Sequence, residues 1–301
     1  MKPLMLVRGG LGDAIMAIPA IEALRALPLV GERMGKPVNI LAHGLRVPGV
    51  LDLFARQAWC GRVYRRVADV PRTATGLIGH WRGNPELPGV RLHVPTSEEG
   101  HISDRLVDVV RGLGYIGPTP PARLLFGKVQ PFRHFRRVCL APETTGYAWK
   151  RWPEGHWVEL CRGIRKRGYE IVLLGSEWRS VRYRSLCADY RGKTTIEQAA
   201  TLMLKSSAVV GIDSGLLHLA AALGCRTVGL YGPTDPGLCG PRSGTVVQPD
   251  TACAPCWRDP TAQCLCARMP RKEQAEPKSP SMPTVPCMQA ITVEQVLEAL
   301  P

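Results

Sequence analysis

A strand-like segment that ends in Asp-Ser-Gly carries the residues best suited to bind an anion. Residues 208–213 are apolar up to Asp213, and the segment after Ser214 is apolar almost throughout, which predicts a buried strand followed by a buried helix. Gly215 removes the side chain from the first turn of that helix, so its N–H groups can bind an anion such as a phosphate. His218 follows one turn later on the same face as Ser214, and it is either a further donor or an ordinary core histidine.

A second candidate site is the loop after the apolar segment that starts at residue 136. Thr144 and Thr145 lie in this loop, and Lys150 follows five residues later. Two hydroxyl groups beside an ammonium group are suited to phosphate oxygens. A polar loop without a specific function has the same composition, so both interpretations stay open.

The N-terminal segment Arg8-Gly9-Gly10-Leu11-Gly12-Asp13 separates a predicted strand from a predicted helix. Glycines allow a sharp turn and a close approach of a ligand to the backbone. The spacing does not match the dinucleotide fingerprint, so nicotinamide binding is not indicated. Asp13 lies at the start of a helix, where the helix dipole keeps a carboxylate ionised. It is therefore either a general base toward a hydroxyl group or a helix cap.

Five of the eleven cysteines lie close together near the C-terminus: Cys253, Cys256, Cys264, Cys266 and Cys287. A Cys-x2-Cys pair with further thiols can hold zinc or iron in a tetrahedral site. Four thiolates leave no open position for a substrate, so such a metal would be structural. Reduced thiols without a metal are the alternative. The odd total argues against a disulfide framework, and the other six cysteines have the apolar neighbours expected of buried thiols.

The elements that must position these residues alternate between strands and helices along both halves of the chain. This alternation predicts α/β structure with parallel sheets in two domains. Residues 117–135, with three prolines within five residues, are interpreted as the linker, and residues 257–286 as an irregular excursion. Predicted strands lie at 4–8, 38–44, 75–81, the start of 136–145, 169–176, 208–213 and 226–233. Predicted helices lie at 14–27, 50–59, 101–115, 156–168, 195–206 and 214–224, with a closing helix that starts after Thr292.

Composition narrows the function classes. The net charge is +14, with 17 basic against 10 acidic residues in 1–130 and 22 against 15 in 131–301. A diffuse excess of this kind suits a polyanionic partner, either a phosphorylated glycan, DNA or an anionic membrane surface, or it is a solvated surface without a specific partner. No run reaches the roughly 18 apolar residues of a transmembrane segment, and the N-terminus resembles a strand more than a signal peptide. A cytoplasmic location is expected.

Residues 56–91 carry seven arginines against Asp69 and Glu86, with Trp59, Tyr64 and Trp81 among them. This composition predicts a basic surface that bears aromatic rings. Such a surface suits the phosphates or carboxylates of a glycan, or a nucleic-acid backbone with bases stacked on the rings. A plain solvated face is the third interpretation.

Three ordered segments resemble the heptosyltransferase family (glycosyltransferase family 9), and the resemblance covers nearly the whole chain. They are GGLGDAIMAIPAIEALRAL, APETTGYAWKRWPEGHWVEL and GIDSGLLHLAAALGCRTVGLYGPTDP. The resemblance implies an α/β fold of GT-B architecture, with two Rossmann-like, doubly wound domains that face each other across a cleft. Residues 1–130 would form the acceptor-binding domain. Residues 131–301 would form the nucleotide-sugar donor-binding domain, with a Cys-rich loop at 253–287.

The resemblance also implies an activity: inverting transfer of heptose from an ADP-sugar to a hydroxyl of a phosphorylated glycan such as lipopolysaccharide core, without a catalytic metal. Such an activity suits a cytoplasmic protein, either free or in peripheral contact with the inner face of the membrane. Acceptors of another class, a modified DNA base or a protein, stay open, as does a nucleotide- or nucleic-acid-binding protein without catalysis. The Cys-rich loop resembles loops that hold a structural metal in some relatives. By position, Asp13 matches the catalytic base, and donor contacts fall on Gly12, Thr144, Thr145, Lys150, Glu177, Asp213, Ser214, Gly215 and His218.

Overall fold

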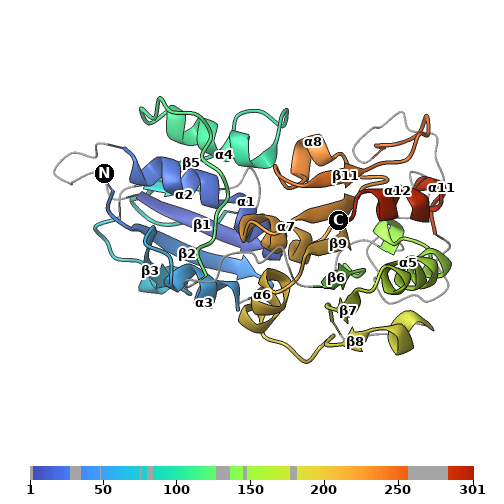
Figure 1. Cartoon of the computed structure of the whole chain (residues 1–301). Coiled ribbons are helices and arrows are strands. Elements are labelled where there is room, and N and C mark those ends of the chain that lie inside the picture. The colour runs from blue at the N-terminus through green and yellow to red at the C-terminus, as the bar shows by residue number, and fades with distance from the viewer. Residues whose placement is uncertain are drawn as a thin grey trace. The chain divides into compact units, whose positions relative to one another are not determined.

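The computed structural model describes residues 3–27, 35–47, 49–74, 76–79, 84–126, 136–144, 148–176, 182–256 and 284–301. The chain divides into two compact units, Met1–Phe126 and Gly127–Pro301 (Figure 1). The sequence analysis placed the boundary between residues 130 and 131. Each unit contains one parallel sheet and is described separately.

The sheet of the N-terminal unit has β1 at its centre. Its strand order is β3-β2-β1-β4-β5, and all its strand pairs are parallel. Leu4 to Val7 of β1 are buried on both faces, as expected for a central parallel strand. The strands are β1 (Pro3–Gly9), β2 (Val38–Leu45), β3 (Cys60–Tyr64), β4 (Gly76–Ile78) and β5 (Arg91–His93).

The helices of this unit differ from the prediction at one point. The single helix predicted over 14–27 is two helices separated at Ala17, because Pro19 lacks the N–H that would continue the hydrogen-bond ladder. Helices α2 and α4 pack against each other, while the opposite sheet face, with Leu4 and Leu6, packs against loop residues such as Val67 and Val90. The helices are α1 (Leu11–Met16), α2 (Ile18–Arg25), α3 (Val50–Ala55), the 3-10 turn η1 (Val67–Asp69) and α4 (Ile102–Arg111).

The sheet of the C-terminal unit has the strand order β11-β10-β9-β6-β7-β8. The chain enters at β6, runs outward to β7 and β8, and then returns to place β9 on the other side of β6. This reversal between β6 and β9 is the topological switch point at which open α/β sheets bind ligands. The strands are β6 (Arg137–Ala141), β7 (Glu170–Leu173), β8 (Ala188–Asp189), β9 (Ala208–Ile212), β10 (Thr227–Leu230) and β11 (Thr245–Val247).

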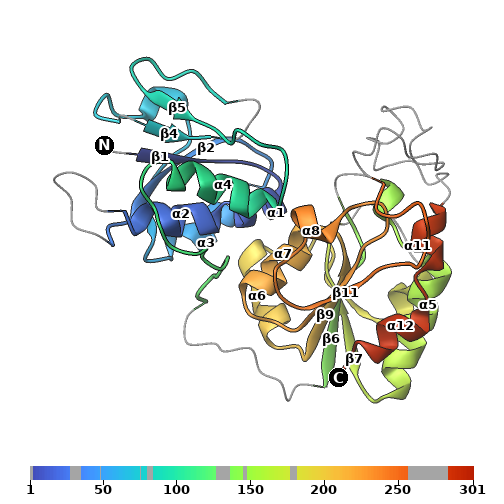
Figure 2. The ribbon, with the colours of Figure 1, turned by 90° about the horizontal axis from the view of Figure 1, so that it is seen from above.

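Helices cover both faces of this second sheet, as the doubly wound prediction requires. Figure 2 shows α6 and α7 on one side of the strands and α5 and α12 on the other. The closing helix α12 begins as predicted, with Thr292 Oγ1 accepting a hydrogen bond from the Gln295 N–H at 3.2 Å. The helical elements are η2 (Ala148–Lys150), α5 (Glu154–Lys166), η3 (Arg182–Leu186), α6 (Ile196–Leu204), α7 (Gly215–Ala222), α8 (Pro236–Cys239), α11 (Pro286–Ala290) and α12 (Val293–Glu298).

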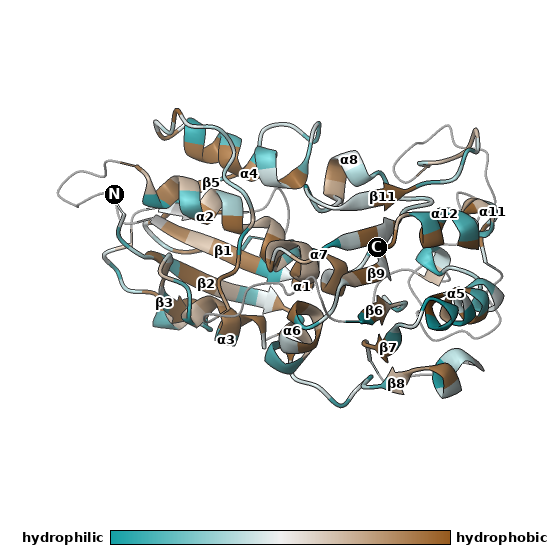
Figure 3. Cartoon of the chain, viewed as in Figure 1, coloured by the Kyte–Doolittle hydropathy of each residue, from teal (hydrophilic) through white to brown (hydrophobic). Residues whose placement is uncertain are grey.

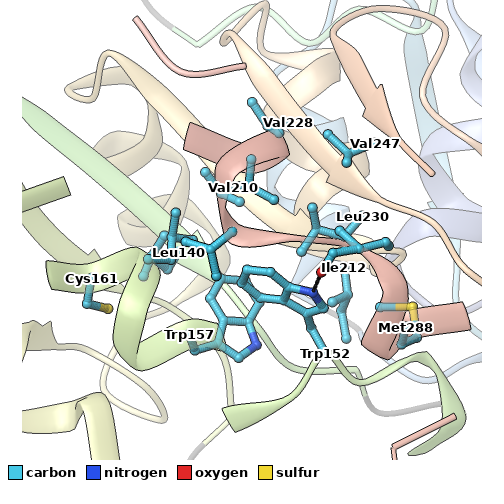
Figure 4. Close-up of a cluster of buried hydrophobic side chains, with 14 of the residues drawn as sticks. Leu140, Trp152, Trp157, Cys161, Val210, Ile212, Val228, Leu230, Val247 and Met288 are labelled. Carbon is cyan, nitrogen blue, oxygen red and sulfur yellow. Dashed lines mark hydrogen bonds between the residues drawn. The ribbon is translucent and has the colours of Figure 1, made fainter. Parts of the chain in front are cut away.

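The core of the C-terminal unit is built around two tryptophans that follow Lys150. Trp152 and Trp157 meet edge to face with ring centroids 5.0 Å apart, and they pack against alternate residues of the central strands (Figure 4). The indole N–H of Trp152 donates to the Ile291 carbonyl at 2.9 Å, which ties the start of α5 to the C-terminal segment. Helix α5 buries its apolar stripe here and leaves its charged residues outside (Figure 3).

The scattered cysteines are free thiols. Cys139, Cys161, Cys225 and Cys239 are buried, as expected, while Cys60 and Cys187 are partly buried. Burial raises the pKa of Cys139 to about 12, so this thiol stays protonated and unreactive. Among the helices that the structure describes, none has the length and apolar character needed to cross a membrane.

Candidate functional site

The centre of the candidate site is a buried ion pair at the switch point. Ala141 at the end of β6 lies beside Gly211 near the end of β9, so the loops after these two strands leave the sheet next to each other. Lys150 Nζ, from the first loop, donates to Asp213 Oδ2 at 2.5 Å, and the two side chains are 13% and 8% exposed. The chain thus brings together two predicted site residues that are 63 positions apart.

His218 joins this pair from the first turn of α7. Its Nε2 lies 4.0 Å from Asp213 Oδ1, so the carboxylate has the ammonium on one oxygen and the imidazole near the other. His218 is 5% exposed and Thr144 is 9% exposed, so both side chains are buried. This arrangement favours a role for His218 in binding an anion over the role of an ordinary core histidine.

Buried hydroxyl groups lie at the N-cap of α7 and in the segment after β10. Ser214 occupies the N-cap position, but its hydroxyl makes no capping hydrogen bond. Ser214 Oγ, Tyr231 Oη and Thr234 Oγ1 are all buried without a hydrogen-bond partner among the described residues. Burial, and then the charge of Asp213, raise the pKa of Tyr231 well above its ordinary value, so the phenol is a neutral donor. Buried hydroxyls without partners are uncommon, and here they mark a polar ligand site.

Sequence reasoning missed a group of charged residues directly behind Thr144. Glu143, Asp189 and Arg191 form an ion-pair network at the ends of β6 and β8. Arg191 is among the largest fully buried side chains of the molecule. Charged residues are almost never fully buried unless they are paired, so burial is the signal that identifies the network, and burial is not visible in the sequence.

Asp13 lies in the N-terminal unit, in the first turn of α1. Its carboxylate is exposed, and Oδ2 accepts a hydrogen bond from the Gly10 N–H at 2.7 Å. Gly9 has a φ of +81°, and a Cβ at this position would overlap Asp13 Oδ2, so glycine is needed there. Gly12 is buried within the same helix. Asp13 therefore caps its helix, and its exposed carboxylate also remains accessible to a substrate hydroxyl.

The predicted aromatic surface at 56–91 needs a correction. Trp59 is 4% exposed and packs edge to face on Phe54 at 5.0 Å, and Tyr64 is 6% exposed within the core. These two buried rings cannot stack on bases, so they no longer support nucleic-acid binding. Trp81 lies outside the described residues. The arginines behave as predicted wherever the structure describes them, because Arg56, Arg62, Arg65, Arg66, Arg72 and Arg91 are all exposed.

The cysteine cluster is described in part. Cys256 donates its backbone N–H to the Pro233 carbonyl at 3.1 Å, and a Cβ on Gly232 would come within 3.1 Å of Cys287 Sγ. Both cysteines therefore pack against the same turn after β10. The described residues contain no group of three or more His, Cys, Asp or Glu side chains placed to hold a metal. Cys264 and Cys266, like the predicted donor contacts Thr145 and Glu177, lie outside the described residues.

The fold and this site define a two-unit α/β protein with an anion site at the switch point of its C-terminal sheet. Residues 128–265 match the model of glycosyltransferase family 9 (heptosyltransferase). Lipopolysaccharide heptosyltransferase 2 of Salmonella typhimurium is 37% identical over 105 residues, a match that covers 31% of this chain and 30% of that protein. The segment 128–265 is therefore similar to glycosyltransferase family 9.

Solved structures extend this similarity from the sequence match to the fold of the whole chain. The Escherichia coli ADP-heptose lipopolysaccharide heptosyltransferase II has a TM-score of 0.68 at 19% identity, over 99% of this chain and 97% of that one. The dodecameric iron-containing heptosyltransferase TibC of Escherichia coli has a TM-score of 0.69 at 19% identity, over 99% of this chain and 75% of that one. The chain therefore has the GT-B type of fold, with two Rossmann-like units, as predicted.

Proposed function

We propose that the protein is an inverting glycosyltransferase that moves heptose from ADP-heptose to a hydroxyl group of a phosphorylated glycan such as lipopolysaccharide core. The observation that carries this proposal is the buried Lys150–Asp213 pair, next in sequence to Ser214, whose buried hydroxyl has no partner within the described residues. This arrangement lies at the switch point and within the segment that matches the family model. The curated relatives match about a third of the chain and are named as lipopolysaccharide heptosyltransferases, which favours this donor and acceptor.

The site supplies the charge that departure of a nucleoside diphosphate requires. The ammonium of Lys150 has three donors, so it can stay bonded to Asp213 while it binds a phosphate oxygen. The N–H groups and dipole of α7, with the hydroxyls of Ser214 and Thr234, add neutral donors to the same diphosphate. Thr144 and His218 complete the described wall of this donor site. Glu177 and Thr145 remain proposed contacts to the ribose and the phosphates.

Inversion follows from a single displacement. The Asp13 carboxylate removes the proton from the acceptor hydroxyl, and the resulting oxygen attacks the anomeric carbon of the heptose. The bond from that carbon to the diphosphate breaks on the opposite side, and ADP carries away the electron pair. Lys150 and α7 stabilise the negative charge that develops on the leaving diphosphate. The proposal needs no catalytic metal, because these groups neutralise the leaving group.

The acceptor is proposed to bind the N-terminal unit. Its exposed arginines suit the phosphates of a lipopolysaccharide core, and they would also suit the anionic surface of the membrane on which that glycan is carried. DNA is a weaker candidate, because Trp59 and Tyr64 are buried and cannot stack on bases.

The test begins with thermal stabilisation by ADP, GDP, UDP and their sugars. A ligand that binds the folded state alone raises its stability by about 2.7 kcal/mol at a hundred times its Kd. ADP and ADP-heptose are expected to stabilise the protein, and ADP release is expected to require a phosphorylated core oligosaccharide. If no nucleotide stabilises the protein, the donor proposal is wrong. ADP release with modified DNA or a protein in place of the glycan would change the acceptor but keep the transferase.

We also propose that the Cys-rich loop holds a structural zinc or iron ion through four of the five cysteines Cys253, Cys256, Cys264, Cys266 and Cys287. Cys256 and Cys287 pack against one turn, and the structurally similar TibC is iron-containing. Elemental analysis of the purified protein is expected to find about one metal ion per chain. Cys256→Ser is expected to lose it and to lower the melting temperature. If the purified protein contains no metal and Cys256→Ser leaves the melting temperature unchanged, the cysteines are reduced thiols that bind no metal.

A further inference from the structure

The buried guanidinium of Arg191 lies at the centre of a charge network behind the proposed donor site. All three of its nitrogens donate to carboxylates. Nε and Nη2 donate to the two oxygens of Asp189 at 3.0 and 3.1 Å, and Nη1 donates to Glu143 Oε1 at 2.7 Å. The side chain of Arg191 is 2% exposed and that of Glu143 is 7% exposed, so this pair is withdrawn from solvent.

The network joins the ends of three neighbouring strands. Glu143 follows β6, Ser176 follows β7, and Asp189 ends β8. The Ser176 hydroxyl donates to Glu143 Oε2 at 3.2 Å, and a Cβ on Gly175 would come within 2.7 Å of the same oxygen. The carboxylate of Glu143 is therefore held between Arg191 on one side and the backbone after β7 on the other.

These strand ends carry the proposed nucleotide contacts. Glu143 directly precedes Thr144, and Ser176 directly precedes Glu177, the proposed ribose contact. The network lies at the carboxyl edge of the sheet on the β7 and β8 side of the switch point, whereas the Lys150–Asp213 pair lies on the β9 side. The two charge clusters thus flank the place at which a nucleotide binds such a sheet.

The pairing of Arg191 with two carboxylates offsets part of the free-energy cost of burying these charges. Burial raises the pKa of Glu143, and the hydrogen bond and charge of Arg191 act in the opposite direction. Burial also acts to raise the pKa of Asp189, but hydrogen bonds from Arg191 outweigh it and hold this pKa below its ordinary value. Buried ion pairs often contribute little stability compared with apolar residues, and their best-attested use is to fix one geometry.

We propose that Glu143 and Arg191 are positioning residues that hold the strand ends at Thr144 and Ser176 in the form that binds the nucleoside end of the donor. This inference rests on the proposed function, because it assigns a role within the same donor site. Neither residue is expected to take part in bond breaking. Their loss should therefore weaken donor binding in the ground state and the transition state alike, which raises KM and leaves kcat nearly unchanged.

The experiment compares donor kinetics and ADP affinity across variants of the full chain. Glu143→Gln keeps the shape of the side chain and removes its charge. It is expected to raise the KM for ADP-heptose and the Kd for ADP by about tenfold while kcat changes by less than about threefold. Arg184→Gln is the matched control, because Arg184 contacts Asp189 from outside, at 51% exposure. This control should change KM by less than about twofold.

A second pair of variants separates positioning from stability. Arg191→Met alone leaves the buried carboxylate of Glu143 without its cationic partner and leaves Asp189 with Arg184, and it should lower the melting temperature. Adding Glu143→Gln to it should recover part of that loss, because fewer unpaired charges remain. The KM of the double variant should stay high, because the bridge between the loops is still absent. If KM recovers together with the melting temperature, the network is merely structural and the inference is wrong.

Ser176→Ala keeps the inference testable if the charge variants do not fold. It removes one hydroxyl from Glu143 Oε2 and should raise the donor KM by about threefold. A folded Ser176→Ala or Glu143→Gln protein with the KM of the wild type overturns the inference while the proposed function stands. If the wild type neither binds ADP nor turns over any donor, the proposed function fails and the inference fails with it.

Discussion

The two aspartates assigned to the reaction lie in opposite environments. Asp213 of the C-terminal unit is 6% exposed and bonded to Lys150, whereas Asp13 of the N-terminal unit is exposed and accepts a backbone hydrogen bond from Gly10. A buried carboxylate held by an ammonium is already fixed in place before a ligand arrives. An exposed carboxylate can exchange a proton with a substrate and then with water.

The contrast indicates a division of work between the two units. The C-terminal unit has buried hydroxyls on Ser214, Tyr231 and Thr234 that find no hydrogen-bond partner within the described residues. Preorganised donors of this kind stabilise charge without reorganisation during the reaction. The N-terminal unit offers the exposed carboxylate of Asp13 and several exposed arginines.

The largest effect is expected from Asp13→Asn. The amide keeps an oxygen for the Gly10 N–H, so the helix cap and the fold should persist. Loss of the base should lower kcat by about 10³-fold, while the Kd for ADP changes by less than about twofold. ADP-release kinetics and calorimetric ADP titration measure these quantities. Asp52→Asn, in the first turn of α3, is the control for an exposed helix carboxylate of the same unit and should keep full activity.

A kcat for Asp13→Asn within about tenfold of the wild type would assign Asp13 to helix capping alone. An equal loss of ADP affinity in this variant would contradict the division between the units.

The second prediction concerns Lys150→Met. It removes the ammonium from the donor site and leaves Asp213 buried without that partner. The kcat/KM for the donor should fall by about 10²-fold, and the free energy of unfolding should fall by about 3 kcal/mol. Adding Asp213→Asn should restore much of the stability but none of the activity. Urea unfolding and donor kinetics on the same samples separate the two effects, and a double variant that regains activity would contradict the role given to Lys150.

The third prediction concerns Ser214, where a substitution should weaken donor binding without lowering stability. Its hydroxyl is buried and has no partner within the described residues, so Ser214→Ala should leave the melting temperature unchanged or raise it slightly. Donor KM should rise by about tenfold, because a hydrogen bond to a charged phosphate is lost. Thr292→Ala is the matched control at the cap of α12 and should show the reverse pattern, with lower stability and unchanged KM. Unaltered KM in Ser214→Ala would remove this hydroxyl from the donor site.

The contacts that sequence reasoning anticipated and those that it missed differ in a physical way. Lys150 and Asp213 both follow strands whose residues are almost all apolar, and the common carboxyl edge of a parallel sheet brings the loops after these strands together. The Glu143–Arg191 pair depends on β8, a strand of two residues, and on the loop after it. Two residues carry no periodic signal, so this partner of Glu143 could not be predicted.

The error at Trp59 and Tyr64 has a different cause. A charge-rich window predicts exposure for every residue within it, but Arg62 and Tyr64 are two residues apart in β3 and therefore lie on the same face of the sheet. The guanidinium of Arg62 lies over the Tyr64 ring, 5.5 Å from its centroid, so Arg62 stays exposed while the ring beneath it is buried. The missed strands β3, β5, β8 and β11 contain two to five residues each, and none is a continuous apolar run of the kind that predicted β6 and β9.

The smallest effect is expected from the exposed arginines of the N-terminal unit. Arg65→Gln combined with Arg72→Gln removes two charges from the basic face and should raise the acceptor KM by about two- to fivefold at low salt. The difference should vanish as salt screens the remaining charges, and the donor KM should not change. Acceptor kinetics at two salt concentrations measure both quantities.

Arg162→Gln, on the exposed face of α5 in the C-terminal unit, is the control for net charge. If it raises the acceptor KM as much as a substitution in the N-terminal unit does, the attraction comes from the total charge of +14 and has no preferred face. If Arg162→Gln leaves the acceptor KM unchanged, the acceptor binds to the N-terminal unit. In that case the C-terminal unit binds the donor and the N-terminal unit binds the acceptor, as proposed.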